Sequence, residues 1–180
     1  MRGVRIWLIG MAACGAGFVP SVAARGVGWS SLRRPLHVPR LEPGAACPIS
    51  HSDRSVDFAR FGIARGIGPG PAYLIGMPRG VLFVVPSTDG GAWAAQKVLW
   101  FVHPSYRGPV LVRGRRLDAA GLVRFDRGVL PAAELRLAAG TTERPSFTRL
   151  RALGCYVYQI DGVGFSRVIV FRATGRVASP

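Results

Sequence analysis

The sequence has few of the residues from which recognisable active sites are built. Its 180 residues include three cysteines, three histidines, nine acidic residues and a single lysine. No metal-ligand cluster, Gly-x-Ser-x-Gly motif or phosphate-binding loop is present in it. Outside residues 6–19, no apolar run approaches the ~20 residues of a membrane-spanning helix. These absences exclude the familiar nucleotide-binding and α/β-hydrolase motifs, and they leave the function unassigned by motif.

Glycine and proline, by contrast, are abundant, with 24 and 14 residues. The hydrophobic fraction is 49% and charged residues make up 18%, so the chain can bury a core and is not disordered by composition. Frequent turns between short apolar runs predict an all-β protein. Roughly 155 residues remain once an export signal is removed, which favours one domain.

Residues 1–24 have the pattern of an export signal. Two arginines precede the apolar run over residues 6–19, and Val22-Ala23-Ala24 places small residues where a signal peptidase cuts. Alternatively, Met11-Ala12-Ala13-Cys14-Gly15 is a lipobox, with Met11 in place of the usual leucine, and Cys14 is lipidated. An uncleaved anchor is the third alternative. The first two predict an extracytoplasmic protein, secreted or lipid-anchored to the cell envelope.

Cys47 and Cys155 are the two cysteines outside this signal. In an oxidising compartment the simplest expectation is that they form one disulfide. A zinc site containing Cys47, His51 and Cys155 is the alternative, because a C-x3-H spacing can place two ligands on one metal. A fourth ligand is missing nearby, so we predict a disulfide, with no metal and no other cofactor.

The chain divides into four predicted parts: an export signal over residues 1–24, a Pro/Arg-rich linker or edge segment over 25–46, a β-sandwich domain over 47–174 and a tail over 175–180. Within the domain, short apolar runs closed by glycine, proline or Asp-Gly predict nine strands. They lie at about 72–76, 81–86, 97–103, 109–114, 122–125, 133–138, 146–151, 155–160 and 166–173.

Two of these strands have further signals. Within residues 97–102 apolar side chains occur at both odd and even positions, so both faces of a strand there would be apolar. This predicts a central strand covered on both faces, with Trp100 or Phe101 as core anchor. Asp161-Gly162 separates the last two runs and indicates a hairpin turn, because glycine takes the positive φ that a tight turn needs.

This closing unit, residues 154–173, resembles the last hairpin of bacterial immunoglobulin-like sandwich domains, in the form of an exported family of unknown function with a Gly-Cys-Tyr strand near its end. The resemblance implies an all-β, immunoglobulin-like two-sheet sandwich of about seven to nine short strands. An antibody-type domain would have a tyrosine where this chain has Leu153, and a tryptophan where it offers Phe58 and Phe61. Cys47 is therefore expected either between the sheets or tying an N-terminal strand to that of Cys155.

The net charge of +15 comes almost entirely from scattered arginines. Together with an export signal, this favours anionic lipid headgroups or wall polymers over nucleic acid as partners, with membrane contact only through the lipid anchor. A solvated basic face without a dedicated site is the simpler interpretation. Arg113, Arg115 and Arg116 form the densest cluster and are candidate ligand-binding residues.

Trp93, Tyr73 and Tyr106 lie at predicted loops or strand ends and are candidates for a sugar-binding platform, although core packing is the commoner role of such rings. No catalytic residue is assigned, since His37, His51 and His103 stand in no recognisable motif. We therefore predict a non-catalytic, exported binding or structural module of the cell envelope, with an unidentified ligand. A carbohydrate-binding module is the alternative, and a hydrolase the less favoured third.

Overall fold

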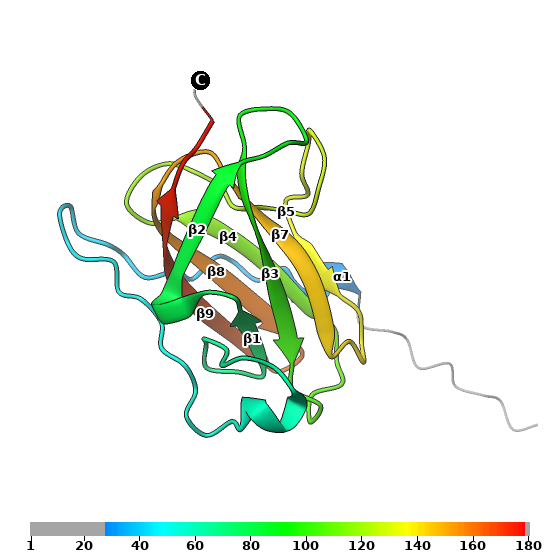
Figure 1. The fold of residues 1–180 in the computed structure, drawn as a ribbon. Helices are drawn as coiled ribbons and strands as arrows, with labels where there is room; N and C mark the ends of the chain where they lie inside the picture. The colour runs from blue at the N-terminus through cyan, green and yellow to red at the C-terminus, as the bar shows by residue number, and fades with distance from the viewer. Residues whose placement is uncertain (1–27, 179–180) are drawn as a thin grey trace, which may run out of the picture.

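The computed structural model describes residues 28–178 (Figure 1). The predicted export signal, its cleavage point and Cys14 lie outside this range. Three short helical turns are present: α1 (Trp29–Leu32), η1 (Phe58–Phe61) and η2 (Pro78–Gly80). Each of the nine predicted strands overlaps one observed strand: β1 (Ala72–Ile75), β2 (Val81–Pro86), β3 (Ala94–Val102), β4 (Val110–Arg116), β5 (Arg124–Phe125), β6 (Leu135–Leu137), β7 (Glu143–Leu150), β8 (Gly154–Gly162) and β9 (Phe165–Gly175).

The strands form a single hydrogen-bonded sheet in the order β5-β7-β3-β2-β9-β8-β4-β6, with β1 added to β3. All pairs are antiparallel except β2 with β9, which are parallel. Residues 121–125 contact both β4 and β7, two strands that are far apart in this order. The amide of Val123 donates to the carbonyl of Gly114 in β4, and β5, which begins at the next residue, pairs with β7.

The main core lies between the strands and receives side chains from every one of them. Its largest members are Trp100 of β3, Phe125 of β5, Tyr156 and Tyr158 of β8 and Phe171 of β9. The Tyr158 ring stacks on Phe171 at 4.6 Å between centroids, and its hydroxyl pairs with the Thr148 hydroxyl at 2.6 Å. Alternation along short strands thus buries one apolar face per strand in a common core.

The central strand behaves as its sequence predicts, because β3 pairs with β7 on one side and with β1 and β2 on the other. Trp100 points into the main core, whereas Phe101 packs with Phe58, Tyr73 and Ile75 in a second cluster on the opposite face. Both faces of β3 are therefore covered, and both predicted anchors are buried.

The β8–β9 hairpin is present, but its turn lies two residues later than the Asp161-Gly162 pair predicts. Asp161 pairs with Ser166 and Gly162 with Phe165, so the turn lies at residues 163–164. Gly164 has the positive φ, +83°. Asp161 is fully buried and accepts hydrogen bonds inside the protein, which is why it belongs to the strand.

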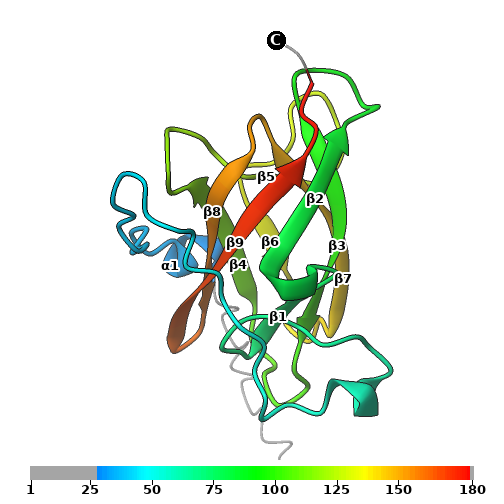
Figure 2. The same ribbon diagram turned by 60° about the vertical axis from the view of Figure 1, so that its left-hand side comes forward.

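Residues 28–50, here called the N-terminal segment, cover the outer face of β8 and β9 (Figure 2). Val38, Leu41 and Cys47 pack on Cys155, Val157 and Val170. The predicted Cys47–Cys155 disulfide is present, with 5.5 Å between the Cα atoms. Cys155 faces away from the main core, so the disulfide attaches the N-terminal segment to the sheet rather than joining two sheets. No part of this segment is assigned as a strand.

A buried polar network also holds the N-terminal segment on the sheet. Asp161 accepts hydrogen bonds from Arg113, at 2.8 Å, and from Gln159, and the Arg34 guanidinium lies 3.5 Å from it. Gln159 in turn donates to the Pro35 carbonyl at 3.0 Å and accepts from the His37 amide at 2.7 Å. These bonds satisfy groups that burial would otherwise leave unpaired.

Within residues 28–178, no helix reaches the length and apolarity needed to cross a membrane.

Candidate functional site

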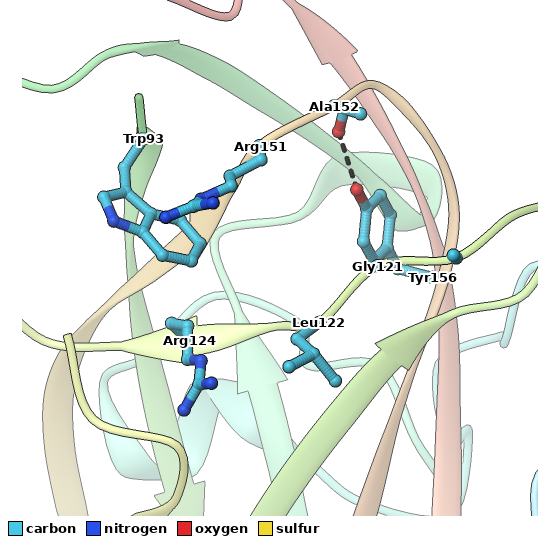
Figure 3. Close-up of a pocket in the computed structure, with 8 residues that line it drawn as sticks. Trp93, Gly121, Leu122, Arg124, Arg151, Ala152 and Tyr156 are labelled. Carbon is cyan, nitrogen blue, oxygen red and sulfur yellow. Dashed lines mark hydrogen bonds between the residues drawn. The ribbon is translucent and has the colours of Figure 1, made fainter. Parts of the chain in front are cut away.

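The loops at one end of the molecule enclose a cavity of about 360 Å³. This end, here called the loop end, consists of residues 87–93, 117–123, 126–131 and 151–153, which cluster at the top of Figures 1 and 2. The residues that line the cavity, most of them labelled in Figure 3, are Trp93, Ala120, Gly121, Leu122, Arg124, Arg151, Ala152 and Tyr156.

Strand register brings Trp93 and Arg151 together. Ala94 of β3 pairs with Leu150 of β7, so the residues just beyond this pair, Trp93 and Arg151, lie opposite each other. The Arg151 guanidinium carbon sits 4.5 Å from the centre of the Trp93 ring. Figure 3 shows the two side chains against each other. Such cation–π contact positions the cation without neutralising it.

Leu122 and Arg124 enter the lining from the segment that precedes and forms β5. Val123 and Phe125 point into the main core. Because side chains alternate along an extended chain, Leu122 and Arg124 face away from that core and toward the cavity. The Leu122 side chain is 55% exposed, so this wall of the cavity offers an apolar surface beside a cation.

Tyr156 closes the cavity on the side of β8. Its hydroxyl donates to the Ala152 carbonyl at 2.7 Å. Burial raises the pKa of Tyr156, so the phenol stays neutral at physiological pH. It therefore supplies shape and an aromatic edge to the site rather than a charge.

The charged side chains that line the cavity are all positive. Its lining contains two arginines and no acid, and among residues 28–178 neither Arg124 nor Arg151 forms an ion pair. The nearby acids have other partners. Asp89 binds the buried Arg149 at 2.7 Å, and this hydrogen bond holds the pKa of Asp89 below its usual value. Asp118 binds Arg116 and the Cys155 amide.

The three aromatic candidates do not form a common platform. Trp93 lines the cavity but is only 7% exposed, because Arg151 lies over its ring. Tyr73 is buried in the second cluster, where burial raises its pKa to about 12. Tyr106 packs edge-on against Phe165 and donates to the Pro109 carbonyl. Only Trp93 therefore belongs to the candidate site.

The structure also separates the arginine candidates. Arg113 turns to Asp161 beneath the N-terminal segment, and Arg116 pairs with Asp118. Arg115 alone is exposed. The three arginines lie within four residues of sequence, but they have different surroundings, so they do not present one cationic face.

The histidines and the remaining cysteines show no catalytic arrangement in the part of the chain that the structure describes. His103 Nδ1 lies 2.7 Å from the Ser105 hydroxyl, a local turn contact, and its ring packs on Phe61. His51 lines a separate cavity of about 710 Å³ with Arg65 and Arg79. No three His, Cys, Asp or Glu side chains among residues 28–178 are grouped as metal ligands require.

Sequence reasoning missed Leu122, Arg124 and Arg151. A signal existed, because Leu122-Val123-Arg124-Phe125 alternates within a predicted strand and Arg151 ends another. What was missing was the strand pairing that brings these two places to Trp93.

Comparisons with protein-family models, with curated proteins and with solved structures give no match for this chain.

Proposed function

We propose that this protein is a non-catalytic, exported module of the cell envelope whose loop-end cavity binds an anionic group of an envelope component. The observation that carries the proposal is the pair Arg124 and Arg151, which share an aromatic-lined cavity with no acid. Guanidinium groups bind phosphate and carboxylate through paired hydrogen bonds, and partial enclosure strengthens that attraction over its value in open water.

The proposal also includes export from the cytoplasm and the arrangement of the strands in two sheets. The Cys47–Cys155 disulfide supports an oxidising compartment. Release by cleavage after Ala24 and attachment through lipidated Cys14 are both compatible with envelope function. We also propose an immunoglobulin-like two-sheet sandwich, since β1, β3, β5 and β7 form one hydrogen-bonded group and β4, β6, β8 and β9 another, with β2 pairing into both.

An anionic ligand has more support than a neutral sugar. Sugar binding usually uses an open aromatic face, and here Arg151 covers the Trp93 ring. The hydrolase alternative has the least support, because the cavity lining offers no serine, cysteine, histidine or carboxylate to act as nucleophile or base.

Titration with inorganic polyphosphate and with sn-glycerol 3-phosphate tests the proposal. Binding is followed by intrinsic tryptophan fluorescence, and a Trp93→Phe variant identifies the contribution of Trp93. We expect saturable binding that weakens as salt rises, and at least tenfold weaker binding after Arg124→Gln/Arg151→Gln. The matched control is Arg60→Gln/Arg107→Gln, which removes the same charge near the far end of β3 from two exposed residues. Equal loss in both variants would show that net charge, not the cavity, is responsible.

A further inference from the structure

The loop end also exposes apolar side chains that the cavity does not use. Leu130 is 92% exposed and Val129 is 61% exposed, both at the tip of the loop that follows β5. Within residues 28–178, Leu130 is the most exposed of the large hydrophobic residues. Apolar side chains exposed together at one place are typical of surfaces that contact another molecule.

Contacts place this tip beside the cavity. The Gly128 amide donates to Asp89 at 3.3 Å, which joins the loop of residues 126–131 to the loop of residues 87–93. A side-chain carbon built on Gly90 would lie 3.7 Å from Val129, so Val129 adjoins the chain that leads into Trp93. Figures 1 and 2 agree in placing the two loops next to each other.

Positive charge surrounds the apolar tip. Arg127, next but one to Val129, lies 3.6 Å from Asp89, but that carboxylate is already bound by Arg149 at 2.7 Å. One carboxylate therefore serves two guanidinium groups. Arg124 and Arg151 in the adjoining cavity add two more cations with no acidic partner among the described residues. The loop end combines apolar tips with an excess of arginine behind them.

We propose that the loop end docks on a membrane surface rich in anionic phospholipid, with Val129 and Leu130 among the acyl chains and the arginines at the headgroup phosphates. The inference rests on the proposed anion-binding function and names the source of the anion. A lipid surface fits both halves of the pattern, because it offers an apolar phase just below a layer of phosphates. A soluble polyanion attracts the arginines but gives Leu130 nothing to bury.

Vesicle co-sedimentation tests this docking. The protein carries Cys14→Ser and is purified after cleavage of the signal following Ala24, so that neither an acyl chain nor the apolar run of residues 6–19 contributes. Vesicles are phosphatidylglycerol with phosphatidylcholine, or phosphatidylcholine alone. We expect binding to the anionic vesicles at least tenfold tighter than to the neutral ones. Val129→Ser/Leu130→Ser should weaken vesicle binding at least tenfold while leaving polyphosphate binding unchanged.

The matched control is Leu36→Ser/Val163→Ser, which removes two exposed apolar side chains from the N-terminal segment and the β8–β9 turn. It should keep vesicle binding within twofold. Fluorescence gives a second readout, because Leu130→Trp should be quenched by brominated acyl chains more strongly than the parent protein. Equal binding to both vesicle types, or an equal loss in both serine variants, overturns the docking proposal. Arg124→Gln/Arg151→Gln could instead abolish polyphosphate binding and leave vesicle binding intact. That result would show that the cavity does not take part in membrane docking, and it would overturn the proposal that both ligands use one site.

Discussion

The face under the N-terminal segment and the loop end both contain arginines, yet they use them in opposite ways. Where the segment meets the sheet, Arg34 of the segment and Arg113 of β4 surround the fully buried Asp161. In the loop-end cavity, Arg124 and Arg151 line a surface without an acid. Since the chain has only nine acids, their positions decide which arginines stabilise the fold and which stay available to a ligand.

Arg149 shows that this distinction depends on burial as well as on region. It lies in β7 beside the loop end, but it is fully buried and pairs with Asp89. A buried guanidinium needs a carboxylate to offset its lost hydration, whereas the half-exposed Arg124 and the exposed Arg151 keep theirs. The comparison therefore predicts that substitutions under the N-terminal segment lower stability strongly, whereas substitutions of the cavity arginines lower it little.

The largest expected effect is on the disulfide that fastens the segment. Reduction of Cys47–Cys155, which spans a sequence separation of 108 residues, should lower the free energy of unfolding by about 4–5 kcal/mol in the chain-entropy model. Urea unfolding of the oxidised protein and of the reduced, alkylated protein measures the difference. An unchanged midpoint would mean that the segment contributes little to holding the domain together.

Next in size is the buried ion pair. Asp161→Asn keeps the shape of the side chain but leaves Arg113 and Arg34 without a counter-charge, so we expect a loss of about 3–5 kcal/mol. Asp57→Asn, at an exposed position, is the control and should stay within about 0.5 kcal/mol. Similar losses in both variants, measured by urea unfolding, would contradict the difference between buried and exposed charges.

Replacing the cavity arginines should scarcely affect stability. Arg151→Gln removes a cation–π contact with Trp93, and we expect a loss of no more than about 1 kcal/mol. Arg124→Gln, which breaks no ion pair, should stay within about 0.5 kcal/mol. If either variant unfolds as readily as Asp161→Asn, these arginines support the fold and the contrast between the two regions fails.

The smallest expected effect is the loss of stability at low pH. Arg33 donates a hydrogen bond to Glu134, and Arg149 donates one to Asp89, so both carboxyl pKa values are lower in the folded protein. Their stabilising contribution is therefore complete above the unfolded pKa of about 4, and it is lost as pH falls through the folded pKa values. The melting temperature should drop between pH 5 and pH 2, and less so in Glu134→Gln. A melting temperature that rises over this range would refute the assignment.

Much of the fold follows from local sequence. Glycine and proline end each apolar run, and alternation within the runs decides which side chains are buried, so all nine strands were predicted to within a few residues. The disulfide followed from the two cysteines that remain once Cys14 is assigned to the predicted export signal. The hairpin turn was misplaced because Asp-Gly is a local turn signal, while Asp161 has buried partners, including Arg113, that lie far away in the sequence.

The sequence by itself determined strand positions, the central place of β3 and the pairing of Cys47 with Cys155. Only the tertiary structure decided that an irregular N-terminal segment covers β8, that Arg113 is buried while Arg151 is not, and that Trp93 meets Arg151. The physical reason is range. Turns and alternation depend on neighbouring residues, whereas ion pairs and cavities depend on strand register and on which of few acids lies nearby, and these are settled only when distant segments pack.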